Sequence, residues 1–175
     1  MSKHKKELLL ACAVPVLILL GMCFNPLYTL INGEEITLQT KPVDPSDLFR
    51  GDYVTLRYEA EEVPKQLVDE KVLAQLKEGR GNLDVYVLLK EEKGIHSPVM
   101  ITLDKPKNGV FLKGKLEYID KDTDGTEFAR IQYSLDKYFV EDNTGTDWEK
   151  ASTKGKILAK VRVHNGYAVL KGITK

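Results

Sequence analysis

A long run of uncharged, mostly apolar residues near the N-terminus limits what this chain can fold into more than any other feature. Residues 8–31, 24 in all, contain no Asp, Glu, Lys or Arg. As an α-helix rising about 1.5 Å per residue, the run is about 36 Å long, which exceeds the roughly 30 Å of a bilayer's hydrocarbon core. The run therefore predicts a transmembrane helix rather than an element of a soluble domain.

The charges that flank this run predict its orientation. Lysines 3, 5 and 6 precede it, and Glu34 and Glu35 follow it. By the positive-inside rule the N-terminus is cytoplasmic. We therefore expect a membrane protein with a cytoplasmic stub, an anchor and an extracytoplasmic β-rich domain, at residues 1–7, 8–31 and 32–175; the family resemblance described below implies that the membrane is a bacterial cell membrane.

A cleaved signal peptide is the alternative interpretation of this segment. Ala11-Cys12-Ala13 lies too early to be its cleavage site, and no pair of small residues at cleavage spacing follows the run before Gly33. Leu20-Gly21-Met22-Cys23 has only a faint likeness to a lipoprotein box, because Met22 is too large for its position. The sequence favours an uncleaved anchor.

Composition excludes several classes of protein. A hydrophobic content of 42% is enough for a packed core, and 26 basic residues balance 26 acidic ones, which gives no support for nucleic-acid binding. Both cysteines, Cys12 and Cys23, lie inside the apolar run. The exported domain therefore has no disulfide and no cysteine-based metal site.

The pattern after the anchor is mostly that of β-strands. Turn residues such as Asn108-Gly109 and Asp124-Gly125 separate short runs rich in β-branched and aromatic residues. Asn165-Gly166 predicts a two-residue hairpin turn. One helix is expected at residues 64–78, from its starting proline and apolar spacing. The strands are expected at residues 53–59, 83–90, 98–103, 110–119, 127–133, 156–164 and 167–173. The fold class is mainly β: an N-terminal transmembrane helix followed by a small antiparallel sandwich or barrel-like domain with one short helix.

An acidic segment resembles the start of a calcium-binding loop. Asp120, Asp122 and Asp124 alternate before Gly125, as in such loops, but Ile131 occupies the place of the bidentate glutamate. The flanks are predicted strands rather than helices. We expect a solvated hairpin turn, with these three aspartates as a weak candidate metal site and no cofactor.

A search for a catalytic nucleophile finds no convincing site. The three histidines lack metal-ligand spacing and do not accompany a serine elbow. Signal peptidases are also membrane-anchored and largely β, and Ser46 lies at a suitable distance after the anchor. Asp47 follows it, however, where such enzymes have Met-x-Pro. No catalytic residue is predicted, and a degenerate signal-peptidase-like hydrolase stays as the alternative.

One motif stands out: Gly51-Asp52-Tyr53, then Leu56 and Tyr58. It resembles the defining motif of the bacterial GDYXXLXY family, and the resemblance extends from Asp44 to Ile173. The resemblance implies a single-pass membrane protein without an established activity, from a family often associated with multi-spanning membrane proteins. Strand alternation places Asp52, Leu56 and Tyr58 on one face. We expect Asp52 to be structural, accepting backbone N–H bonds; a carboxylate at a pocket rim is the alternative.

The closing hairpin predicts a candidate binding face. A two-residue turn pairs Val163 with Ala168 and continues the register so that Lys160 lies opposite Lys171, which is destabilising. The predicted basic face comprises Lys160, Arg162, His164, Tyr167 and Lys171. Water and nearby acids such as Glu117 or Glu149 would offset the repulsion, or the face docks an anionic partner. We therefore expect a non-enzymatic accessory subunit that binds another membrane protein or an anionic envelope component.

Overall fold

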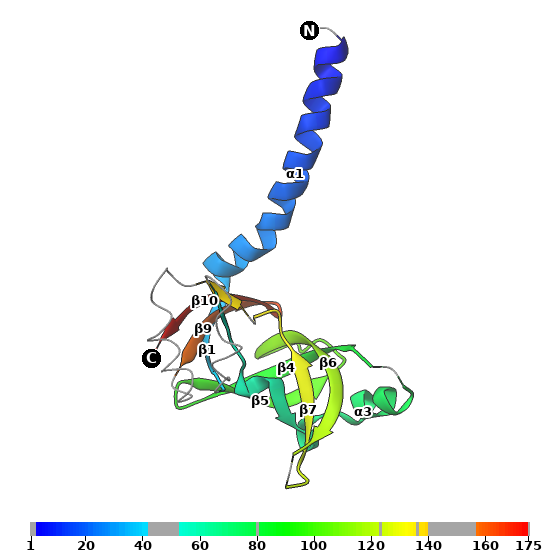
Figure 1. The fold of residues 1–175 in the computed structure, drawn as a ribbon, viewed down its shortest axis with the longest axis vertical. Coiled ribbons are helices and arrows are strands. Elements are labelled where there is room, and N and C mark those ends of the chain that lie inside the picture. Colours follow the sequence, from blue (N-terminus) through cyan, green and yellow to red (C-terminus); the bar gives the residue numbers. More distant parts are fainter. Residues whose placement is uncertain are drawn as a thin grey trace.

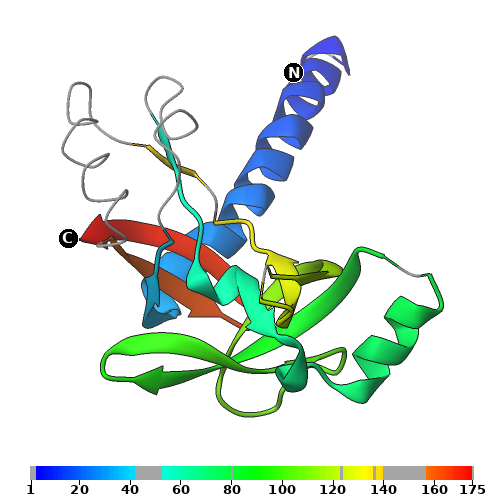
Figure 2. The ribbon, with the colours of Figure 1, turned by 60° about the horizontal axis from the view of Figure 1, so that its bottom comes forward.

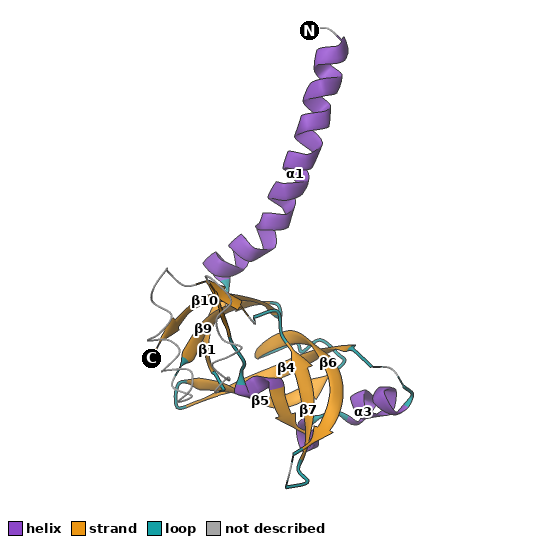
Figure 3. Cartoon of the chain, viewed as in Figure 1, coloured by secondary structure: helices purple, strands orange, loops and turns teal. Residues whose placement is uncertain are grey.

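The computed structural model describes residues 3–41, 53–79, 81–122, 124–135, 137–139 and 157–174. A long helix, α1 (Lys3–Asn32), projects from a domain in which strands predominate (Figures 1 and 3). The domain also contains a short helix, α3 (Glu70–Lys77), and two 3₁₀ turns, η1 (Glu59–Glu61) and η2 (Lys65–Leu67). The predicted class, mainly β with an N-terminal helix and one short helix, is confirmed.

Helix α1 has the length and composition of a single membrane span or signal anchor. Its segment Ala11–Asn32 has a mean hydropathy of 1.9, and only 6% of the apolar window is buried against the rest of the protein. Two prolines, Pro15 and Pro26, lie inside the helix. Figure 1 shows that the helix axis bends before it reaches the domain. A proline inside a helix cannot donate the intrahelical bond and is a common cause of such bending.

The strands within the described residues form three antiparallel sheets. The orders are β1-β9-β10, β3-β7-β6-β4-β5 and the two-stranded β2-β8. The strands are β1 (Glu34–Gln39), β2 (Tyr53–Thr55), β3 (Glu62–Pro64), β4 (Leu83–Glu92), β5 (Ile95–Thr102), β6 (Val110–Lys121), β7 (Glu127–Gln132), β8 (Lys137–Phe139), β9 (Leu158–His164) and β10 (Tyr167–Thr174).

One hydrophobic core joins the three-stranded and five-stranded sheets. Figure 2 shows β1, β9 and β10 lying across the green strands of the larger sheet. Alternate residues of each strand enter the core, for example Ile36 and Leu38 of β1 and Val85 and Val87 of β4, all 0% exposed. Two polar contacts also join the sheets, from Lys113 N to Gly166 O at 2.8 Å and from Thr37 N to the ring of His96 at 3.4 Å.

The turn between β9 and β10 has the predicted geometry. Asn165 and Gly166 have φ values of 52° and 84°, as a tight hairpin of this type requires. Gly166 is needed for a second reason, because a Cβ there would lie 2.8 Å from the ring of Phe111. The turn therefore has two roles: it closes the β9–β10 hairpin and it packs against β6.

Two sequence predictions differ from the observed elements. The helix predicted at residues 64–78 is shorter, because Glu62–Pro64 pairs with β7 as strand β3 and Asp69 caps α3 by accepting a bond from Lys71 N at 2.8 Å. The strand predicted at residues 53–59 ends at Thr55 and leads into the η1 turn. Strands β1, β3 and β8 were not predicted.

Candidate functional site at the junction of helix and sheet

A single residue, Gly33, separates helix α1 from strand β1. Its amide donates to Thr29 O at 2.8 Å, which continues the helical pattern, and its carbonyl accepts from Arg162 Nη1 of β9 at 2.7 Å. A Cβ at this position would lie 2.4 Å from Thr29 O and 3.0 Å from Val163 O. Glycine is therefore required here by space, and the helix enters the sheet without a linker.

The carboxylate of Glu35 lies at the centre of the predicted basic face. It pairs with Arg162 across the β1–β9 ladder, with Arg162 Nη2 at 3.5 Å, and Lys171 Nζ of β10 lies 2.6 Å from Glu35 Oε2. The hydrogen bond from Lys171 and the charges of Arg162 and Lys160 hold the pKa of Glu35 below its ordinary value. Two of the five predicted binding residues thus share one acid, which offsets one of their two positive charges.

The predicted opposition of Lys160 and Lys171 is wrong. The hairpin register holds as predicted from Tyr167–His164 to Leu170–Val161 and then shifts at a β-bulge. Lys160 lies opposite Gly172, and Lys171 is the extra residue. The bulge directs Lys171 to Glu35. The acid that contacts this face is Glu35, which the sequence analysis did not name, and Glu149 lies outside the described residues.

The other two members of the face, His164 and Tyr167, lie at the hairpin turn and pair with each other across the ladder. The ring of His164 contacts Tyr28 of α1 edge-on, with centroids 5.0 Å apart, and Asn165 Nδ2 lies 3.1 Å from His164 Nε2. Tyr167 is 46% exposed. The structure thus brings all five predicted residues onto one sheet, but Arg162 and His164 are used to hold the helix.

The last two residues of the Gly-Asp-Tyr-x-x-Leu-x-Tyr motif belong to the core. Leu56 is 2% exposed and Tyr58 is 0% exposed, on the same face as predicted. The hydroxyl of Tyr58 donates to Leu135 O at 2.7 Å, and its backbone bridges to Thr40 after β1. Tyr53 begins β2 and pairs with Phe139. Gly51 and Asp52 lie outside the described residues, so the expected role of Asp52 stays a prediction.

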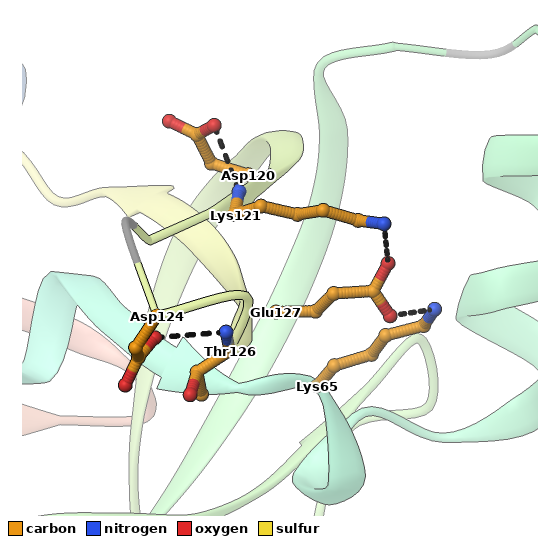
Figure 4. A network of polar contacts seen from close by, with 6 residues as sticks. All are labelled: Lys65, Asp120, Lys121, Asp124, Thr126 and Glu127. Atoms are coloured by element: carbon orange, nitrogen blue, oxygen red, sulfur yellow. Dashed lines mark hydrogen bonds and ion pairs between the residues drawn. The ribbon is translucent and has the colours of Figure 1, made fainter.

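The acidic segment forms a hairpin turn between β6 and β7. Asp120 Oδ1 accepts from Lys121 N at 2.9 Å, and Asp124 Oδ1 accepts from Thr126 N at 2.9 Å. The bond from Thr126 lowers the pKa of Asp124. Figure 4 shows the carboxylates of Asp120 and Asp124 pointing away from each other. Among the described residues, Asp120, Asp122 and Asp124 do not form a group able to hold a metal ion.

Next to this turn, Glu127 joins two lysines into a small ionic network. Lys65 Nζ lies 2.5 Å from Glu127 Oε2, and Lys121 Nζ lies 3.4 Å from Glu127 Oε1 (Figure 4). The hydrogen bond from Lys65 is the main cause of the lowered pKa of Glu127. The network links η2 to the β6–β7 hairpin, which is a structural role.

Glu61 is a titratable group that the sequence did not single out. Partial burial raises its pKa from 4.5 to about 7, although the Tyr58 backbone and the charges of Arg57 and Arg130 oppose the shift. Burial also raises the pKa of Tyr133, whose hydroxyl donates to Ala60 O at 3.0 Å. The local sequence, Glu59-Ala60-Glu61-Glu62, is typical of an exposed acidic segment. The partial burial of Glu61 therefore could not be predicted from its neighbours in the chain.

Two hollows lie on either side of the β9–β10 turn. One, of about 590 Å³, is bounded by the end of α1, the β5–β6 loop and the turn itself. The other, of about 560 Å³, is lined by residues of β4, β6 and β10 and of the segment after β7. The first contains Lys105 and Lys107, which the sequence did not mark because their loop is distant from the helix along the chain.

The fold and this junction define a class of protein: a β-rich domain whose first strand continues directly from a long apolar N-terminal helix. A sequence model of the GDYXXLXY protein family matches residues 15–173, nearly the whole chain. The chain belongs to this family, as its motif and strand segments predict. No curated protein and no solved structure matches the chain significantly.

Proposed function

We propose that the protein is a bacterial single-pass membrane protein whose β-rich domain is a non-enzymatic accessory subunit. In this proposal residues 1–7 are cytoplasmic, residues 8–31 cross the cell membrane and residues 32–175 lie outside it. The exposed apolar surface of α1 and the lysines before it support this topology. The domain binds another membrane protein or an anionic envelope component.

The observation that carries the proposal is the direct connection of α1 to the sheet. Gly33 is bonded both to the helix, at Thr29, and to β9, at Arg162. A domain on a flexible linker samples a large volume around its anchor, whereas a domain joined in this way keeps one orientation at the membrane surface. Such an orientation suits repeated contact with one neighbouring membrane partner and removes part of the entropic cost of binding.

Inserting a flexible six-residue Gly/Ser segment between Asn32 and Gly33 tests this function. The full chain, purified in mild detergent, should retain one membrane protein in stoichiometric amount. The insertion should reduce that recovery several-fold while leaving the thermal midpoint of the β-domain within a few degrees. Intact mass should show the uncleaved anchor.

The alternative, a signal-peptidase-like hydrolase, predicts a different result. Ser46→Ala would then abolish cleavage of a membrane substrate and leave partner recovery unchanged. Replacement of Asp52 by Ala should lower the thermal midpoint if that residue is structural, because backbone donors would lose their acceptor. Recovery of no stoichiometric partner, together with Ser46-dependent cleavage, would contradict the accessory-subunit proposal.

A further inference from the structure

The 590 Å³ hollow lies where helix α1 enters the domain. Its wall contains Asn32, the last residue of α1, and Glu34, the first residue of β1. Opposite these, the β5–β6 loop contributes Lys105 and Lys107, and the β9–β10 turn contributes His164. The hollow therefore opens at the end of the helix, at the level of the lipid headgroups if α1 spans a membrane.

Positive charge predominates in this hollow. Lys105 Nζ lies 3.3 Å from Asn165 Oδ1 and 6.0 Å from the ring centroid of Phe111, so a neutral amide and an aromatic face position it. Lys107 is exposed and makes no ion pair among the described residues. Glu34 is the one carboxylate in the described lining. An anion entering here meets the side chains of two lysines that line the same hollow.

A polar and aromatic column on α1 leads into the same hollow. Phe24, Tyr28 and Asn32 are spaced by four residues and therefore lie on one face of the helix. The rings of Phe24 and Tyr28 stack with centroids 5.8 Å apart, and Tyr28 touches His164 in the hollow's wall. Phe24 is 64% exposed and Tyr28 is 42% exposed. Apolar and aromatic surface thus continues into the cationic hollow.

The geometry points to a binding site for an anionic phospholipid, with its phosphate between Lys105 and Lys107 and an acyl chain along Phe24 and Tyr28. This inference rests on the proposed membrane insertion of α1. An acidic peptide would use the two charges but would leave the exposed aromatic column uncovered. A phospholipid uses both features, and it is present at the helix end without a separate encounter.

Native mass spectrometry of the full chain in detergent tests the site, with phosphatidylglycerol and phosphatidylcholine of identical acyl chains as probes. Wild type should bind phosphatidylglycerol more tightly. The double variant Lys105→Gln/Lys107→Gln should lose about fivefold in affinity for each lysine, with phosphatidylcholine binding unchanged. The matched control is Lys77→Gln/Lys93→Gln, since both lysines are exposed, one on α3 and one in the β4–β5 turn.

A second variant separates a lipid site from a simple phosphate site. Phe24→Ala should weaken phosphatidylglycerol binding, and inorganic phosphate alone should not compete at millimolar concentration. Equal affinities for the two lipids, or full phosphatidylglycerol affinity in the double variant, would overturn the proposal. Full competition by inorganic phosphate would overturn it as well. Alkaline extraction of the same variants from membranes reports separately on insertion of α1, so failure of the anchor is distinguishable from failure of the site.

Discussion

Tyr58 shows at the scale of a residue what the last position of the family motif does in the fold. Its ring is fully buried, its hydroxyl bonds to Leu135 O at 2.7 Å, and its backbone bridges to Thr40. A buried tyrosine requires such a partner, because an unpaired hydroxyl in the core is costly. Leu56 enters the same core. These two positions attach the segment after β2 to the core.

Three residues after Tyr58, Glu61 should make the stability of the domain depend on pH. Its pKa is raised from 4.5 to about 7 by partial burial, so the folded state binds this proton more tightly than the unfolded state. The stabilising effect is complete below about pH 4.5 and is lost as the pH rises through about 7. The thermal midpoint of wild type should therefore fall between about pH 5 and about pH 8 by more than that of Glu61→Gln.

Glu59→Gln is the control for this measurement, because Glu59 is exposed on the same turn. Its pH profile should follow that of wild type. The groups that act on Glu61, namely Arg57, Glu62 and Arg130, stay in place in both variants. Parallel profiles for wild type and Glu61→Gln would show that the carboxyl does not titrate in this range.

At the scale of the elements, the contacts between α1, β1 and β9 decide how the helix and the domain are joined. The contacts are short and of several kinds: a helical hydrogen bond at Gly33, an arginine bond to its carbonyl, and an aromatic contact between Tyr28 and His164. Glu35 then links β9 and β10 through Arg162 and Lys171. Residues of the face that was predicted to bind a partner, namely Arg162 and His164, therefore hold α1 against the sheet.

Gly33→Ala should destabilise this junction. The new Cβ would lie 2.4 Å from Thr29 O, so either the helix end or β1 must move, at a cost of about 1–3 kcal/mol. Gly21→Ala, inside α1, is the control, since a Cβ there meets nothing within 4 Å. Thermal unfolding of the full chain in detergent should show a lower midpoint for Gly33→Ala only. Equal thermal midpoints for the two variants would mean that the junction accommodates the added methyl group without loss of stability, which would contradict this prediction.

The sequence predicted the elements whose signals are local. The apolar run, strands β4 to β7 of the larger sheet and the Asn165-Gly166 turn follow from periodicity and turn chemistry within a few residues. Strand β1 was missed although Ile36 and Leu38 alternate with polar residues, because the segment is short and directly follows the helix. The partner of Lys171 was missed because Glu35 is 136 residues away in the chain. Likewise, no local pattern places Lys105 beside the end of α1.

At the scale of the whole molecule, the contacts at Gly33 and between Tyr28 and His164 join α1 and the β-domain into one body. Figure 1 shows the helix rising from the three-stranded sheet, whose strands continue into the core shared with the larger sheet. Because the orientation of α1 is set by these contacts, the same residues always surround its C-terminal end. These residues include Lys105 and Lys107 of the β5–β6 loop. Both the proposed accessory role and the proposed lipid site depend on this rigidity.

Distance measurement between spin labels in lipid nanodiscs tests the rigid connection most directly. With Cys12 and Cys23 replaced by Ser, labels at Leu19 in α1 and Lys115 in β6 should give a single narrow distribution. Its width should match that of a reference pair at Lys90 and Lys115 within the larger sheet. The variant with six Gly/Ser residues inserted before Gly33 should give a broad one. A wild-type distribution as broad as that of the insertion variant would contradict the account.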